Sequence, residues 1–195
     1  RNGVYAGFTW TTQSCNRIVG ESILGVTIGS STIGKADSQA ESLQLTGTSN
    51  TISARAIIFA CIFNGGPLNI NASNASVVQC GITVSGRIII DSAAAGSING
   101  WRVVSCVFIG LTSAPADALV LVGATSSGYG QMSANVLTGY TGSLAPSNGA
   151  ALIDLQQSSV NTVSNNTIRD FDGEAIRTGT GAGGLNNNIV ANSID

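Results

Sequence analysis

The chain has 195 residues, of which 43% are hydrophobic and only 9% are charged, and its formal net charge is −2. It contains no run of Lys or Arg, which excludes nucleic acid and anionic membrane surfaces as expected partners. No apolar run approaches the roughly 20 residues of a membrane helix, so membrane insertion is not expected either. Histidine is absent, which excludes histidine general bases, Ser-His-Asp triads and histidine zinc sites.

Short apolar-x-apolar runs bounded by Gly, Ser, Asn or Asp dominate the chain, and such runs are typical of strands. Residues 8–12 and 23–28 are the first predicted strands, but they fit the later repeat poorly. We therefore expect residues 1–37 to form an N-terminal cap or first irregular coils. Residues 38–195 are expected to form one regular domain that continues beyond this sequence.

From residue 38 onward the predicted strands recur in columns. One column consists of apolar-x-apolar runs at residues 43–45, 68–70, 88–90, 119–121, 152–154 and 176–178. A second column has Cys or Asn two residues before a large apolar side chain, at residues 60–63, 79–82, 105–108, 134–137, 165–168 and 191–194. A third, looser column falls at Ile52, Val77, Ile98, Tyr129, Val160 and Leu185. The Cys or Asn position recurs after about 26 residues on average, a period typical of a solenoid.

Three short strands per repeat predict an all-β fold, a right-handed parallel β-helix of about six to seven coils. Stacked coils bury apolar side chains that one coil alone cannot bury. Asn side chains in one column are expected to hydrogen-bond from coil to coil. The alternative is an antiparallel β-sandwich or jelly roll, which needs a turn signal for every hairpin, whereas Asn-Gly and Asp-Gly occur at most once per repeat.

Three of the four cysteines, Cys61, Cys80 and Cys106, share the second column, and Cys15 stands apart. Stacked thiols rarely meet the dihedral angle that a disulfide requires. We therefore expect buried free thiols, which fit assembly in a reducing cytoplasm better than secretion.

Residues 166–168 and 192–194, with the apolar-x-apolar runs between them, resemble the parallel β-helix repeats of the pectate-lyase-like superfamily, and the resemblance covers residues 40–195. The low charge and the surface rich in Ser, Thr, Asn and Gly look most like bacteriophage tailspikes and other virion β-helix proteins. The resemblance implies a homotrimer in the virion, assembled in the host cytoplasm, with a structural or host-surface-binding role. No catalytic motif of that superfamily matches this chain residue by residue.

The densest acidic group consists of Asp170, Asp172 and Glu174, flanked by Arg169 and Arg177. Glycoside hydrolysis uses two carboxylates about 5–9 Å apart, and residues two apart in a strand point the same way. These acids are therefore candidate catalytic residues, and the two arginines are candidates for holding an acidic sugar. A solvated turn is the alternative interpretation, and a cation site made of the same oxygens is a further one.

Trp101, Arg102, Tyr129 and Tyr140 are candidate glycan contacts, because exposed aromatic rings stack on sugars. Packing in the core or at a subunit interface is the alternative for the aromatic residues. Gly-rich residues 179–184 lack the Lys of a phosphate-binding loop and are predicted to be a long turn.

These observations favour a virion-associated structural or host-surface-binding β-helix: a tailspike, appendage or capsid decoration module. The expected partners are two further copies of the chain, other virion proteins and a bacterial surface polysaccharide. No metal or cofactor is expected. A carboxylate-dependent polysaccharide depolymerase of the tailspike kind is the alternative, and a secreted bacterial adhesin is a third possibility.

Overall fold

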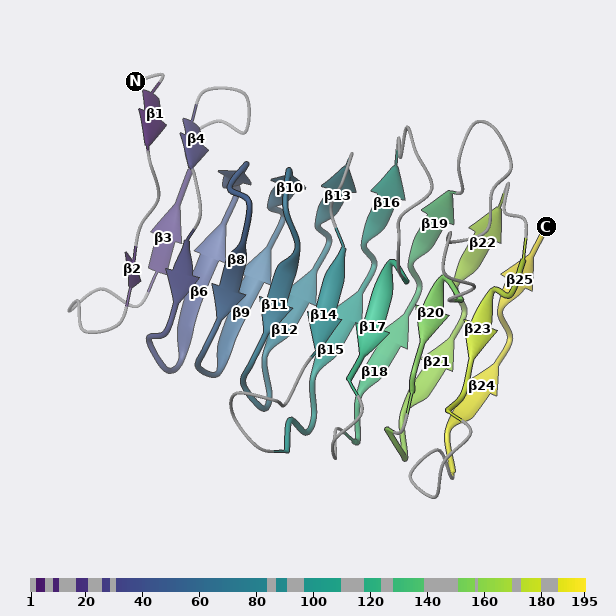
Figure 1. Ribbon diagram of the computed structural model, residues 1–195. Helices are drawn as coiled ribbons and strands as arrows, with labels where there is room; N and C mark the ends of the chain where they lie inside the picture. Colours follow the sequence, from purple (N-terminus) through teal and green to yellow (C-terminus); the bar gives the residue numbers. More distant parts are fainter. Residues whose placement is uncertain are drawn as a thin grey trace.

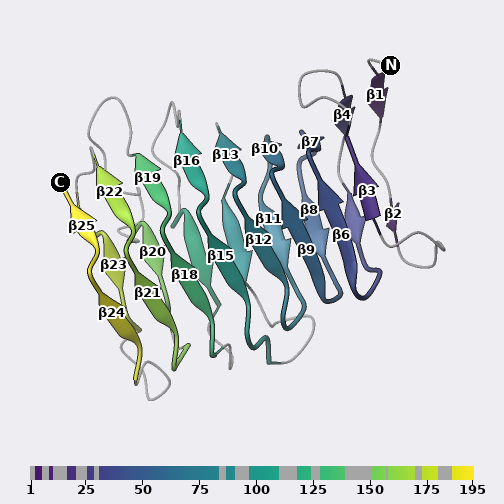
Figure 2. The same ribbon diagram turned by 180° about the vertical axis from the view of Figure 1, so that it is seen from behind.

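The computed structural model describes residues 3–5, 9–10, 17–20, 26–28, 31–83, 87–90, 97–109, 118–123, 128–138, 151–156, 158–169, 173–179 and 186–195 (Figure 1). The strands follow one another along a single axis from the N-terminal end to the C-terminal end, and the view from behind shows the same order (Figure 2). Within these described ranges every element is a strand, and none is a helix.

The strands form three parallel sheets, and the chain visits the sheets in turn. Sheet A has nine strands: β1 (Gly3–Tyr5), β4 (Val26–Ile28), β7 (Gln44–Leu45), β10 (Ile62–Asn64), β13 (Gly81–Thr83), β16 (Val107–Ile109), β19 (Val136–Thr138), β22 (Thr167–Arg169) and β25 (Ser193–Ile194). Sheet B has eight: β2 (Thr9–Trp10), β5 (Thr32–Ile33), β8 (Asn50–Ile52), β11 (Leu68–Ile70), β14 (Ile88–Ile90), β17 (Val120–Val122), β20 (Ile153–Asp154) and β23 (Ile176–Arg177).

Sheet C also has eight strands: β3 (Arg17–Val19), β6 (Ser38–Glu41), β9 (Ala56–Phe59), β12 (Ser76–Val78), β15 (Arg102–Val104), β18 (Gln131–Ser133), β21 (Thr162–Ser164) and β24 (Asn188–Val190). The predicted right-handed parallel β-helix with three strands per coil is thus confirmed. Parallel pairing throughout the sheets rules out the antiparallel sandwich. The described strands that precede residue 38, β1 to β5, pair in the same three sheets.

The core runs along the axis as columns of apolar side chains, one from each coil. In sheet A the inward column includes Leu45, Phe63, Ile82, Phe108, Leu137 and Ile168, which are at most 1% exposed. Alternation along each strand sends the neighbouring side chains outward, so the sequence pattern of each short strand fixes which side is buried. β-Branched and aromatic residues dominate these columns because they pack well on a pleated surface.

A sharp corner joins sheet C to sheet A in each coil. One residue there has a left-handed backbone, with φ between 51° and 56°, at Ser42, Ala60, Gln79, Ser105, Ala134, Asn165 and Ala191. The residue that follows points inward, and it is Leu43 at the first of these corners and the Cys or Asn of the second column at the other six. The predicted ladder of amides is confirmed: Asn135 Nδ2 donates to Asn166 Oδ1 at 2.9 Å, and Asn166 Nδ2 donates to Asn192 Oδ1 at 2.9 Å.

The cysteines occupy the same ladder in earlier coils and make an equivalent contact. Cys106 Sγ donates to the carbonyl oxygen of Val77, and Asn135 Nδ2 donates to the carbonyl oxygen of Val103, the register partner of Val77 in the next coil. Cys61, Cys80 and Cys106 are buried free thiols, as predicted, whereas Cys15 lies outside the described residues. Hydrogen bonds to the thiols of Cys106 and Cys61, together with burial, raise the pKa of Cys80 well above its ordinary value, which keeps it neutral.

Two of the three predicted columns need correction. Residues 43–45 were expected beside residues 68–70, but Gln44 and Leu45 pair with Ile62 and Phe63 in sheet A, and the true partner of β11 is β8 in sheet B. The third predicted column mixes positions, because Ile52 lies in sheet B and Val77 in sheet C. Apolar-x-apolar runs are common to all three sheets, so the pattern alone does not distinguish one sheet from another.

Candidate functional site

The corner between sheets B and C has its own series of left-handed residues. They are Asp37, Asn74, Gly100, Tyr129, Val160 and Asn186, with φ between 53° and 69°. Four of the six are Asp, Asn or Gly, the types that tolerate this backbone. Tyr129 and Val160 break the pattern, and a β-branched valine in this region is a genuine outlier.

The two exceptions are neighbours in space. Bridges from Gly128 to Asn99 and to Ser159 align Tyr129 with Gly100 in the preceding coil and with Val160 in the following coil. Tyr129 is 71% exposed and Val160 is 39% exposed. Burial in the core therefore does not explain these bulky side chains.

Next to this corner, the outer face of sheet C offers a row of polar side chains that we call the sheet C bed. It consists of Arg102, Gln131, Thr162 and Asn188, which are register partners on β15, β18, β21 and β24. Arg102 Nε donates to Gln131 Oε1 at 3.2 Å, and Gln131 Nε2 donates to Ser133 Oγ at 3.2 Å. These bonds fix the orientation of the central amide, so the bed is partly preorganised for hydrogen bonding.

In the N-terminal half of sheet C the same outward column holds Arg17, Gln39, Ile57 and Ser76. Ile57, which is 47% exposed, occupies the column that holds Arg102 and Gln131 further along, and Phe59 and Val78 flank it. At its far end Arg17 forms an ion pair with Glu41. Ile57 therefore interrupts the column of outward polar side chains, and the bed belongs to the stretch that follows this interruption.

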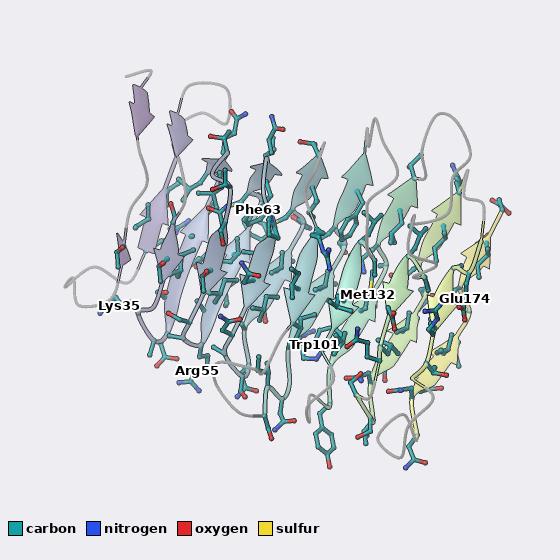
Figure 3. All side chains as sticks on the ribbon, viewed as in Figure 1. Lys35, Arg55, Phe63, Trp101, Met132 and Glu174 are labelled. Atoms are coloured by element: carbon teal, nitrogen blue, oxygen red, sulfur yellow. The ribbon has the colours of Figure 1, made fainter. Side chains whose placement is uncertain are left out.

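The predicted glycan contacts have three different outcomes in the structure. Arg102 is exposed, and its register partner Gln131 lies two residues after Tyr129, so Tyr129 stands at the corner that leads into β18. Trp101 is completely buried inside the helix, so its expected role in stacking on a sugar is wrong (Figure 3). Trp101 lies between Gly100 of the corner and β15, and its side chain points inward, where no ligand reaches it. Tyr140 lies outside the described residues.

The predicted acidic group is only partly described. Asp170 and Asp172 lie outside the described residues. Glu174 lies toward the C-terminal end of the helix and its side chain is 50% exposed (Figure 3). Arg177 Nε donates to Glu174 Oε2 at 2.7 Å, and this hydrogen bond raises the pKa of Arg177 above its ordinary value. Arg169 lies 3.9 Å from the carboxylate of Asp195, and both side chains are largely exposed.

Sequence reasoning missed one acid of this region, Asp154. It is the register partner of Arg177 in the preceding coil, and its Oδ2 lies 3.8 Å from Arg177 Nη1. Only 6% of Asp154 is exposed, and its Oδ1 accepts a hydrogen bond from the backbone N–H of Gln156 at 3.0 Å. An acid at the outward position of an otherwise apolar run was the available signal. One guanidinium thus serves two carboxylates from neighbouring coils.

Other kinds of site are not found in the part of the chain that the structure describes. There, no group of three or more Cys, Asp or Glu side chains is arranged to hold a metal ion. Nor do the described residues include a helix long and apolar enough to cross a membrane. Comparisons of the whole chain with protein-family models, curated proteins and solved structures find no match. The fold and the surface chemistry therefore carry the functional argument.

Proposed function

We propose that this chain is a virion-associated β-helix that binds a polysaccharide on the surface of a host bacterium. The observation that carries the proposal is Tyr129, an exposed aromatic residue with a strained backbone beside the oriented polar bed of Arg102 and Gln131. Aromatic rings and planar polar groups are the side chains that sugars favour: the ring stacks on the sugar, and the polar groups bond its hydroxyls.

The architecture suits a protein that presents a binding surface on a rigid support. A stack of coils with continuous apolar columns and an amide ladder forms a rigid support, and a site on a rigid support loses little entropy when it binds. Buried free thiols agree with assembly in a reducing compartment. We further propose a homotrimer that associates with other virion proteins, since three identical surfaces strengthen a weak contact with a repetitive polymer.

The proposal is tested by sedimenting the fluorescently labelled protein with cells of candidate hosts and with matched strains that lack capsule or lipopolysaccharide side chains. We expect the protein to sediment with the polysaccharide-bearing cells and to stay in solution with the stripped cells. Heat-unfolded protein is the control for nonspecific adhesion. Equal sedimentation with both kinds of cell, or with neither across a broad panel, would contradict a polysaccharide-binding role.

A polysaccharide depolymerase remains the second candidate, and one observation favours it. Asp154 and Glu174 come from neighbouring coils and share Arg177, so the fold does bring acids together that are distant in sequence. Both carboxylates, however, contact the same guanidinium. A glycosidase pair flanks the scissile bond of a sugar, whereas these two carboxylates share a guanidinium, so the arrangement suits an ion-pair cluster better.

A further inference from the structure

We propose that the ligand is an extended, neutral polysaccharide that lies along the helix axis over the sheet C bed, with one sugar over each coil and one ring stacked on Tyr129. This inference rests on the proposed polysaccharide-binding role and adds the chemical class of the ligand, its direction and its contacts.

The direction follows from the repeat. Successive coils in a β-helix are about 4.8 Å apart, and an extended β-linked chain of pyranose rings advances by a similar length per sugar. Arg102, Gln131, Thr162 and Asn188 stand in register on four successive coils. A polysaccharide parallel to the helix axis therefore meets an outward polar side chain at each sugar. A polysaccharide that runs across the coils would leave the bed after one strand.

The position of the aromatic contact follows from the corner. Tyr129 stands in the coil of Gln131, the second coil of the bed, and its side chain is 71% exposed. Every other described residue of the corner series except Val160 is Asp, Asn or Gly, so an unstrained choice is common at this position. Tyr129 therefore exposes a flat ring at the corner that precedes β18, and such a ring is suited to the apolar face of a sugar.

The neutral character of the ligand follows from the charges. Arg102 is the only charged side chain on β15, β18, β21 and β24, and Gln131 already engages its Nε. A polyanion with a carboxylate on each sugar would find one cation over four coils, on a chain whose net charge is −2. Arg169 and Arg177, the other candidates for acidic sugars, already contact carboxylates. Uncharged hydroxyls instead match the amide and hydroxyl groups of the bed.

The test is calorimetric titration of the folded chain with three neutral hexasaccharides, cellohexaose, mannohexaose and xylohexaose, and with hexagalacturonate as an acidic probe of equal length. The variant Tyr129→Asn removes the ring but keeps a residue suited to the left-handed backbone. We expect wild type to bind at least one neutral probe, with little dependence on salt, and Tyr129→Asn to bind it about tenfold more weakly. Its thermal midpoint should stay the same or rise, because the strain is relieved.

The control is Gln79→Asn, which makes the same kind of change at a left-handed, exposed residue of the other corner. It should leave binding unchanged. The inference is overturned if no neutral hexasaccharide binds, if Tyr129→Asn binds as wild type does, or if hexagalacturonate binds more tightly in a salt-dependent way. Cell sedimentation separates these failures from that of the broader proposal. Wild-type protein that still sediments only with polysaccharide-bearing cells keeps the binding role and loses only the neutral ligand on sheet C.

Discussion

Replacement of Asn166 by Ala is expected to lower the free energy of unfolding by about 3–5 kcal/mol, because several buried polar groups lose their partners at once. Asn166 is 1% exposed. Its Nδ2 donates to Met132 O at 3.2 Å and to Asn192 Oδ1 at 2.9 Å, and its Oδ1 accepts from the backbone N–H of Asn135 at 3.0 Å and from Asn135 Nδ2 at 2.9 Å.

Urea unfolding of wild type and variant, followed by circular dichroism, measures this loss. Asn166→Cys should be intermediate, because cysteine in the same ladder donates its thiol to the equivalent carbonyl, as Cys106 does to Val77. Asn188→Ala, an exposed asparagine on the next coil, serves as the matched control and should change the free energy by less than about 0.5 kcal/mol. A loss at Asn166 no larger than that of the control would show that the ladder does not stabilise the stack.

Replacement of Gly130 by Ala is expected to cost about 3 kcal/mol, because the new methyl group would overlap the indole of Trp101. A Cβ at Gly130 would lie 1.9 Å from Cε2, 2.2 Å from Cζ2 and 2.4 Å from Nε1 of that ring. Trp101 is 0% exposed and packs over Gly130 in the next coil, so the ring has no free space to enter. The glycine is required here by the close approach of the ring.

The same unfolding experiment tests this prediction, with tryptophan fluorescence as a second readout of the displaced ring. Gly81→Ala is the matched control, since a Cβ there meets only Ile62 Cγ1 at an ordinary 3.7 Å, and it should be tolerated. Combining Gly130→Ala with Trp101→Leu should cost less than the sum of the two single changes, because the smaller side chain makes room for the methyl group. Additive losses would mean that the two residues do not compete for space.

The regular part of the fold was predictable from the sequence because stacked coils need similar residue types at equivalent positions. Cys or Asn two residues before a large apolar residue marks the corner between sheets C and A, and the structure places an inward ladder there. The loop lengths between sheets vary, so spacing could not assign Gln44 and Leu45 to the correct sheet.

The site was less predictable, because a large apolar or aromatic residue at a corner has the same sequence pattern as an inward residue of a strand. Tyr129 and Val160 were assigned to a strand column, yet their left-handed backbone turns both side chains outward. Trp101 shows the reverse: an aromatic residue beside an arginine suggested a surface contact, but its neighbour Gly130 opens a buried space for it. The pairing of Asp154 with Arg177 arises only from the stacking register, which the sequence does not contain explicitly.

The most direct test of a binding role without cleavage is the number of new reducing ends formed when the protein is incubated with a surface polysaccharide to which it binds. A binding module predicts stable association and no new ends, and unsaturated uronate absorbance should not appear either. New ends that wild type releases and that Asp154→Asn or Glu174→Gln does not release would contradict this role, and would make the cluster around Arg177 the catalytic site of a depolymerase.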